Sequence, residues 1–310
     1  MKKPSKTIIF FGNERLATGV NTEALSLQAL IEAGYGVAAV VLNYEAGKSR
    51  NSRPLEIRAV ADKYKIPVYL PSKLDNQVIN QLKSYRAAAA VLVAYGKLVP
   101  GPVIEMFPRG IINVHPSLLP LHRGPTPIES VILGGDKKTG VSLMQLTEEM
   151  DAGPIYGQSE LLLKTNETKQ ELANELLEIG KSMLLELLPS ILDGTVIALP
   201  QDESRASYDR LLSKPSGIID WSKPAKQIER EIRAYAEWPK SHTKLANIDV
   251  IITSSKVLNL RGEAGKILLD NKKLVVYCGK GALEIVRLKP TGKKEMDAPA
   301  FLAGHSTKLS

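Results

Sequence analysis

Short apolar runs alternate with helical patterns in the first half of the chain. The runs are apolar at nearly every position, which predicts strands covered on both faces of a sheet. They lie at residues 7–11, 37–42, 67–70 and 87–94, with further runs at 111–114 and 139–146. Helical periods at residues 22–33, 54–63 and 75–85 separate the first four runs. This alternation predicts an α/β fold with a mostly parallel sheet.

A longer helix is predicted after these runs. Thr168 and Glu171 have the spacing of a capping box at a helix N-terminus. Apolar residues then recur at helical spacing and form one stripe, made of Leu172, Leu176, Ile179, Met183 and Leu187. We interpret the stripe as core packing, and we expect the helix to end near Pro189 because proline breaks helical hydrogen bonding.

The pattern changes at about residue 200. Residues 201–216 are mostly polar, with prolines at 200 and 215, which indicates a linker. An amphipathic helix is expected at 225–236, and short alternating runs such as 274–277 and 283–286 predict a small β domain. A compact barrel is expected there, with a sandwich as the alternative. We therefore predict one domain over residues 1–203 and a second, with the linker, over residues 204–310.

Composition narrows the class of protein. Hydrophobic residues make up 44% and charged residues 24% of the 310 residues, as in soluble globular proteins. No apolar run is long enough to cross a bilayer or to form the core of a signal peptide, so we expect a cytoplasmic protein that does not bind membranes. Cys278 is the single cysteine, which excludes an internal disulfide. No assembly signal is visible, and a monomer is expected.

The net charge of +8 is concentrated in one part of the chain. Residues 204–310 contain 20 Lys and Arg against 11 Asp and Glu, whereas the first 203 residues contain 21 against 22. A basic domain joined to a neutral one suggests that one part holds a polyanion. The alternative is a surface that is basic for solubility alone.

Several common cofactor sites are missing from the sequence. The first strand is followed by Gly12-Asn13-Glu14-Arg15 with no second glycine until Gly19, which disfavours a dinucleotide site. No Gly-Lys-Ser/Thr phosphate loop is present. The four histidines are spread over the chain without metal-binding helical spacing, so a catalytic zinc and other metals are not expected.

Three polar residues suggest a catalytic site. Asn113 and His115 are two positions apart, so their side chains share one face of a strand. They lie where that strand ends, at the sheet edge that binds ligands in α/β proteins. Asp151 lies in a loop after the next strand, which could bring its carboxylate to the same edge. An amide and an imidazole can stabilise an oxyanion while a carboxylate orients the imidazole and handles protons, which suits acyl transfer.

These residues resemble a known family. Residues 113–120 read Asn-Val-His-Pro-Ser-Leu-Leu-Pro, followed by Arg123-Gly-Pro and later by Asp151-Ala-Gly-Pro-Ile, and they look like the folate-dependent formyltransferases. Segments at 217–222, 232–239 and 288–296 resemble the C-terminal domain of those members that act on charged initiator tRNA. The resemblance covers both domains and implies a Rossmann-like formyltransferase sheet followed by a smaller β-barrel of the OB kind.

The resemblance also implies a reaction and its sites. Its formyl donor would be 10-formyltetrahydrofolate as a co-substrate, and its acceptor the amine of methionyl initiator tRNA, with no metal. Asn113, His115 and Asp151 would be catalytic. The folate would lie against a set of residues at the strand ends: Val93, Ala94, Tyr95, Gly96, Ser117, Leu118, Leu119, Pro120, Glu149 and Gly153.

Two segments depart from the family pattern. Lys48, Arg50 and Arg53 would contact the RNA, but their loop is shorter than the family's usual loop, and a merely solvated basic loop is the alternative. The Gly12-Asn13-Glu14 turn replaces a common Gly-Thr-Pro, a change that leaves the catalytic trio untouched but could alter a substrate pocket.

Two other functions stay open. The protein could formylate a different amine, such as a sugar nucleotide, with the same three residues. It could also be a non-enzymatic RNA-binding protein on the same fold, although the intact Asn113, His115 and Asp151 argue against this.

Overall fold

The computed structural model describes residues 6–43 and 55–309. These residues form two compact units. The first contains residues up to Ile128, then Lys137–Leu163 and Gln170–Arg210, and the second contains Glu129–Asp136, Lys164–Lys169 and the chain from Leu211 onward.

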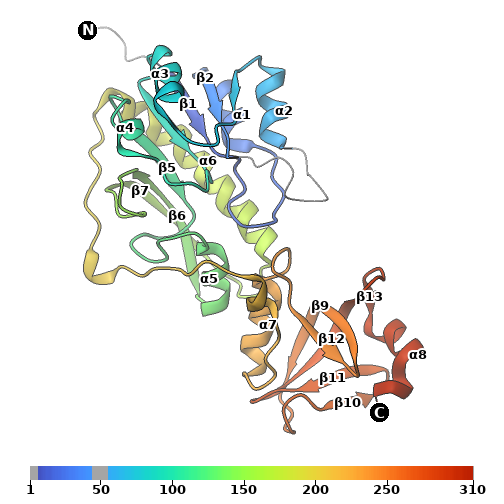
Figure 1. Cartoon of the computed structure of the whole chain (residues 1–310). Coiled ribbons are helices and arrows are strands. Elements are labelled where there is room, and N and C mark those ends of the chain that lie inside the picture. The colour runs from blue at the N-terminus through green and yellow to red at the C-terminus, as the bar shows by residue number, and fades with distance from the viewer. Residues whose placement is uncertain (1–5, 44–54, 310) are drawn as a thin grey trace. The chain divides into compact units, whose positions relative to one another are not determined.

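A seven-stranded sheet forms the centre of the first unit (Figure 1). Its strand order is β3 (Val68–Tyr69), β2 (Gly36–Val41), β1 (Thr7–Phe11), β4 (Ala89–Leu92), β5 (Ile111–His115), β6 (Lys138–Gln145) and β7 (Ile155–Leu162). The first five are parallel, whereas β6 runs antiparallel to β5 and β7 antiparallel to β6. The predicted α/β fold with a mostly parallel sheet is confirmed. The sequence pattern did not indicate β7, which alternates between exposed and partly buried residues at one edge.

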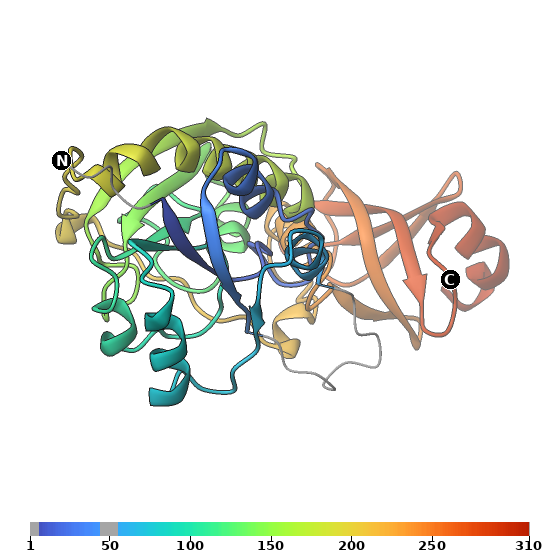
Figure 2. The same cartoon turned by 90° about the horizontal axis from the view of Figure 1, so that it is seen from above.

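Helices cover both faces of this sheet. They are α1 (Leu25–Glu32), α2 (Glu56–Lys63), α3 (Asn76–Ser84), α4 (Gly101–Ile104) and α6 (Lys169–Asp193). Most of α5 (Pro127–Gly134) belongs to the second unit. Figure 2 shows α1 and α6 on one face and α3 and α4 on the other. Apolar residues of α3 and α4, such as Leu82 and Val103, are buried together with Ile9 and Phe11 of β1. The sheet is therefore covered on both sides, as its apolar strands require.

The turn after β1 caps a helix from a distance. The residue before α1, Ala24, has a left-handed φ of 54° and no side chain that could cap the helix. Both carboxylate oxygens of Glu14 accept hydrogen bonds from the first turn of α1, at 2.7 Å from Ser26 N and 2.8 Å from Leu27 N. Glu14 thus satisfies amides that have no partner inside the helix.

The long helix α6 runs past its predicted end. It continues through Pro189 to Asp193, so the expected stop at the proline was wrong. Leu188, Ile191 and Leu192 are buried in the last turns. Their packing offsets the backbone hydrogen bond that proline cannot donate.

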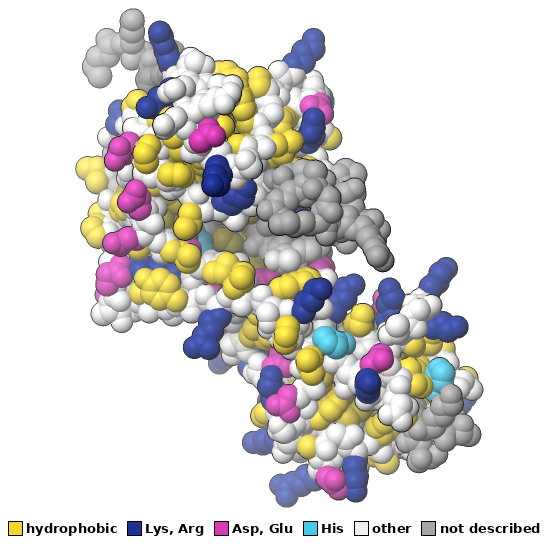
Figure 3. Space-filling model, viewed as in Figure 1, with side chains coloured by type: hydrophobic (Ala, Val, Ile, Leu, Met, Phe, Trp, Pro, Cys, Tyr) yellow, Lys and Arg dark blue, Asp and Glu magenta, His cyan; other side chains and the backbone are white. Residues whose placement is uncertain are grey.

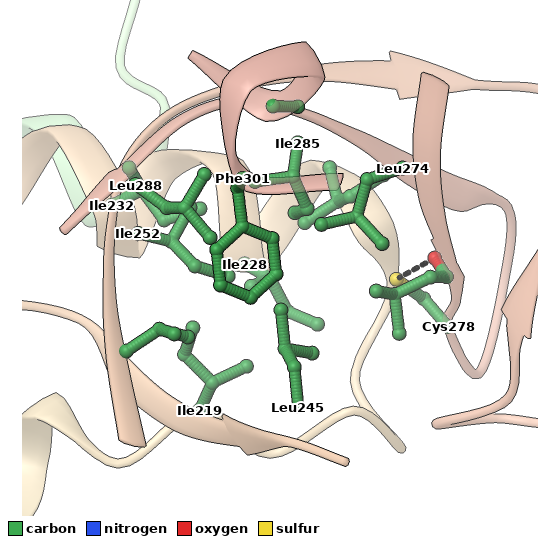
Figure 4. Close-up of a cluster of buried hydrophobic side chains, with 14 of the residues drawn as sticks. Ile219, Ile228, Ile232, Leu245, Ile252, Leu274, Cys278, Ile285, Leu288 and Phe301 are labelled. Atoms are coloured by element: carbon green, nitrogen blue, oxygen red, sulfur yellow. Dashed lines mark hydrogen bonds between the residues drawn. The ribbon is translucent and has the colours of Figure 1, made fainter. Parts of the chain in front are cut away.

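The second unit is built on an antiparallel sheet that curls into a half-barrel. Its order is β10 (Ile267–Asp270), β11 (Lys273–Tyr277), β12 (Ala282–Pro290), β9 (Ile248–Leu258) and β8 (His242–Leu245), with β13 (Met296–Asp297) paired to β12. Helices α7 (Ala225–Ala234) and α8 (Ala298–Leu309) complete the unit. Phe301 lies in the middle of its core, near Ile228 and Ile252 (Figure 4).

The polar segment predicted as a linker is not a free connection. It contains two short 3-10 helices, η1 (Glu203–Arg205) and η2 (Lys214–Gly217). Residues 201–210, which we call the 201–210 segment, form hydrogen bonds with residues 120–126 and 151–153 of the first unit. The segment is therefore part of that unit and reaches the predicted site.

Two classes of feature are missing from the described part of the chain. None of the helices formed by residues 6–43 and 55–309 combines the length and the hydropathy of a membrane span. Within the same ranges, His, Cys, Asp and Glu side chains do not gather in threes at a place that could hold a metal ion.

Candidate active site

The end of β5 carries two of the predicted catalytic residues. Asn113 and His115 are 6% and 5% exposed. They pair across β6 with Met144 and Ser142, which fixes both backbones within the sheet. Because side chains two apart on a strand share a face, the amide and the imidazole lie on the same side of β5.

The loop between β6 and β7 brings Asp151 to His115. Oδ1 of Asp151 lies 3.7 Å from Nδ1 of His115, which is within ion-pair reach but too long for a hydrogen bond. Both side chains are largely buried, and 15% of the Asp151 side chain is exposed. The structure thus brings together an imidazole and a carboxylate that lie far apart in the sequence.

The tautomer of His115 is set by the backbone. Nε2 of His115 lies 2.9 Å from the carbonyl oxygen of His122. A carbonyl oxygen only accepts, so Nε2 carries a proton and Nδ1 of the neutral ring is the nitrogen that faces Asp151. A backbone carbonyl thus takes part in fixing the tautomer of His115, and the role of Asp151 toward the imidazole stays a prediction.

Asp151 is held in place by main-chain groups. Its φ of 50° lies in the left-handed region, which residues other than glycine, asparagine and aspartate seldom adopt. Oδ2 accepts a hydrogen bond of 2.8 Å from Gly124 N. The side-chain amide of Gln201 donates to the carbonyls of Asp151 and Gly153, both at 2.7 Å. These contacts orient the free Oδ1 toward His115.

The buried Arg123 joins the turn after β5 to the 201–210 segment. Arg123 is fully buried and donates to Gln201 Oε1 at 2.8 Å and 3.1 Å. It also donates to both carboxylate oxygens of Glu203 and to the hydroxyl of Tyr208. The Glu203 carboxylate raises the pKa of Arg123, so this guanidinium stays charged. Arg123 therefore anchors the 201–210 segment beside the predicted catalytic residues.

Sequence reasoning missed these supporting residues. Gln201 and Glu203 belong to a polar stretch that looks like a linker, and nothing local marks them as contacts of the site. The available signal was Arg123, a permanently charged residue directly before a glycine and a proline in the same motif. A charge in such a restrained turn requires a nearby carboxylate if the turn is buried.

The predicted folate segment follows β4. Val93, Ala94, Tyr95 and Gly96 form a tight turn in which Ala94 and Gly96 have φ of 53° and 73°. Three of its backbone acceptors are already occupied, because the carbonyls of Val93, Ala94 and Gly96 accept hydrogen bonds from Glu14 N, Asn13 N and Asn43 Nδ2. Tyr95 is buried against Phe11, and burial raises the pKa of Tyr95 to about 12.

A cavity of about 380 Å³ opens beside this turn. It is lined by Ser72, Lys73, Leu74, Asp75, Tyr95, Lys97, Leu98 and Pro100. Lys73 and Lys97 provide positive charge at its wall, and neither was among the predicted site residues. The cavity lies at the carboxyl ends of β3 and β4, where open α/β sheets bind their ligands.

The other predicted folate residues differ in accessibility. In the turn after β5, Ser117 Oγ donates to Leu121 O, and the carbonyl of Leu119 accepts from Gln158 Nε2. Ser117, Leu119 and Pro120 are buried, whereas Leu118 is partly exposed. Glu149 is exposed, and Gly153 is so close to Gln145 that a Cβ would lie 1.9 Å from its carbonyl oxygen. Leu118 and Glu149 are thus the more accessible side chains of this set.

The predicted RNA contacts Lys48, Arg50 and Arg53 lie outside the described residues. The basic residues of the second unit are visible in the structure. On the face in Figure 3, Lys and Arg side chains are spread around this unit rather than gathered in one patch.

Comparisons with known proteins agree over nearly the whole chain. The sequence profile described as formyl transferase matches residues 8–188, and that of the formyl transferase C-terminal domain matches residues 211–306. A methionyl-tRNA formyltransferase of Chloroflexus aggregans is 36% identical over 98% of this chain and 99% of its own. Another from Methylococcus capsulatus is 34% identical over 96% of this chain and 97% of its own.

Solved structures show the same fold. The chain is similar to an N-formyltransferase from Helicobacter canadensis in complex with folinic acid and dTDP-3-aminofucose. The TM-score is 0.68 at 19% identity, over 90% of this chain and 98% of the other. At this identity the likeness establishes the architecture alone.

Proposed function

The chain belongs to the formyl transferase family, and on this premise we propose that it transfers a formyl group from a reduced folate to the amine of methionine on initiator tRNA. The protein is a one-carbon transferase. The single observation that carries the transfer chemistry is the meeting of His115 and Asp151, 3.7 Å apart, at the strand end that also holds Asn113.

The formyl donor is a folate, and we assign it as 10-formyltetrahydrofolate. Its flat pterin suits the apolar turn at Val93–Gly96, and its anionic glutamate suits a wall that carries Lys73 and Lys97. The folate supplies the formyl group and leaves with a proton on N10.

Asn113 would stabilise the charge that develops during transfer. Its side-chain amide has no hydrogen-bond partner among the described residues, so it is available to a substrate. A hydrogen bond from this amide to the formyl oxygen strengthens as the amine attacks and the oxygen gains negative charge. One such donor is typically worth about 2.7–4 kcal/mol of barrier.

His115 would carry the proton. Its Nε2 is engaged by the His122 carbonyl, so Nδ1 accepts the proton that the attacking amine loses. The Asp151 carboxylate stabilises the resulting imidazolium. His115 then returns the proton to N10 as the bond from the formyl carbon to N10 breaks, and the new bond joins that carbon to the methionyl nitrogen.

The basic C-terminal part of the chain supports tRNA as the acceptor. Residues 204–310 carry 20 Lys and Arg against 11 Asp and Glu, and such side chains bind phosphates without reading sequence. The formyl transferase C-terminal profile matches this same region. We further propose a monomer that acts in the cytoplasm, where charged tRNA and reduced folate occur together.

A formylation assay tests the proposal. Purified protein, 10-formyltetrahydrofolate and methionyl initiator tRNA should give formylmethionyl-tRNA, with methionyl elongator tRNA and a dTDP-linked amino sugar as competing acceptors. Preferential formylation of the amino sugar would favour the sugar-nucleotide alternative. Salt-sensitive tRNA binding without transfer to any of the three would favour a non-enzymatic RNA-binding protein.

A further inference from the structure

A second histidine lies next to the proposed proton carrier and is paired with its own carboxylate. Nδ1 of His122 is 3.1 Å from Oδ1 of Asp209, although the two residues are 87 positions apart. The Asp209 side chain is 7% exposed, and its Oδ2 has no hydrogen-bond partner among the described residues. A buried carboxylate requires hydrogen-bond donors, and the His122 ring supplies the donor to Oδ1 of Asp209.

The backbone of His122 is held in an unfavourable conformation. Its φ is 59°, in the left-handed region that side chains with a Cβ rarely adopt. Its main-chain N–H donates to Ser207 Oγ at 2.8 Å, and the neighbouring Arg123 carbonyl accepts from Asp209 N at 2.7 Å. The 201–210 segment thus holds His122 by its backbone and by its ring.

This conformation determines where the His122 carbonyl points. That carbonyl is the acceptor for Nε2 of His115, at 2.9 Å. A change in φ at His122 would rotate the carbonyl away and leave Nε2 without its acceptor. The ring of His115 would then be free to turn or to exchange tautomers.

We propose that His122 and Asp209 form a positioning pair that fixes the orientation and the tautomer of His115. The inference rests on the proposed function, since His115 is there the proton carrier. The pair does not touch the reacting atoms. It acts through one backbone carbonyl, and it extends the active site to one carboxylate of the 201–210 segment, that of Asp209.

A purely structural pair would behave differently. If His122 and Asp209 only stabilise the fold, their loss lowers the amount of folded enzyme and leaves each folded molecule equally active. If they position His115, their loss lowers kcat of the folded enzyme and changes the orientation and the tautomer of the His115 imidazole.

Four variants test this. Asp209→Ala removes the carboxylate, and Asp209→Asn retains an oxygen that can accept from His122. His122→Gly allows the left-handed φ but removes the ring. Asp202→Ala is the matched control, because Asp202 is an exposed carboxylate of the same segment whose contacts are to Ser204.

The expected kinetic result is a loss in kcat. Asp209→Ala and His122→Gly should each lower kcat by about 10- to 100-fold, as a small misplacement of a reacting group does, with KM for both substrates nearly unchanged. The double variant should lose no more than the worse single variant, because both act through one contact. Asp209→Asn should recover most of the loss, and Asp202→Ala should match the unaltered enzyme.

The second readout does not require activity. Imidazole ¹⁵N shifts, assigned to His115 with a His115→Asn variant, should report a proton on Nε2 in the unaltered protein and a mixture of tautomers in Asp209→Ala. Unchanged shifts with unchanged kcat per folded molecule would overturn the positioning pair. If the unaltered protein fails to formylate methionyl-tRNA, the proposed function fails, while the ¹⁵N shifts still decide whether the pair positions His115.

Discussion

Nδ1 of His115 and Oδ1 of Asp151 lie 3.7 Å apart and share no hydrogen bond. The carboxylate is instead anchored through its other oxygen, by the amide of Gly124 at 2.8 Å. This arrangement leaves Nδ1 open to a substrate proton while a negative charge stays close enough to stabilise the protonated ring. Asp151 is therefore suited to stabilise protonated His115 by its negative charge and not by a direct hydrogen bond.

Replacing Asp151 by asparagine should remove the negative charge of this side chain while keeping its size and its hydrogen bond to Gly124. The amide oxygen of the new side chain could still accept from Gly124, so the loop and the folate site should persist. The charge that stabilises protonated His115 is lost, and kcat should fall by about 100- to 10,000-fold, the usual contribution of general acid–base groups. Steady-state kinetics and binding of tetrahydrofolate measure the two effects. An Asp151→Asn enzyme with full turnover would contradict this role.

Replacing Asn113 by alanine should remove one donor to the formyl oxygen. The single-turnover rate should fall by about 100- to 1,000-fold, with little change in folate affinity. Asn113→Asp should be slower still, because a carboxylate would oppose the developing negative charge. Equal rates for the two variants would argue that position 113 does not face the reacting oxygen.

Replacing Gln201 by glutamate should disturb the Asp151 loop without changing its packing volume. The Arg123 guanidinium could still donate to the new carboxylate, but the carbonyls of Asp151 and Gly153 would lose their donor. We expect the free energy of unfolding to drop by about 1–3 kcal/mol, together with a loss of kcat. Urea unfolding and kinetics measure both, and an unchanged midpoint would show that these hydrogen bonds contribute little.

The buried Glu14 should make stability depend on pH. Burial raises the pKa of this carboxyl above its ordinary value of 4.5, so the folded state favours the protonated acid. The stabilisation that Glu14 contributes is complete below its pKa in the unfolded chain. It is lost as the pH rises through its pKa in the folded protein. Relative to Glu14→Gln, the unaltered protein should therefore lose stability as the pH rises from about 4. Urea unfolding over a pH series measures the difference, which should stay constant if Glu14 does not titrate there.

Two glycines with positive φ provide a matched pair. At Gly34, with φ of 82° and open space around it, alanine should cost about 1–2 kcal/mol of stability through its backbone conformation. At Gly12, with φ of 109°, a Cβ would also lie 1.9 Å from the Val93 carbonyl oxygen.

Gly12→Ala should therefore destabilise the protein more than Gly34→Ala does. It should also raise KM for the folate, because the displaced Val93 backbone belongs to the proposed folate site. Thermal unfolding and folate kinetics test the two expectations. Equal destabilisation by both substitutions would mean that the turn adjusts without cost.

Much of the fold is encoded by local patterns. The apolar runs at 7–11, 37–42 and 87–94 became strands β1, β2 and β4, since a strand covered on both faces needs apolar residues at successive positions. The shared face of Asn113 and His115 follows from the period of a strand alone. Pro189 misled the same reasoning, because packing of the last helical turn outweighed one missing hydrogen bond.

The arrangement of the active site depends on contacts between residues far apart in the sequence, which no local sequence pattern predicts. The sequence by itself determined the sheet, the family and the three predicted catalytic residues. Only the tertiary structure showed that the His122 carbonyl engages His115, that Gln201 holds the Asp151 loop from 50 positions away, and that Asp209 pairs with His122 from 87 positions away. The physical reason is that hydrogen bonding inside strands and helices depends on near neighbours, whereas loop conformations depend on which distant groups supply their polar partners.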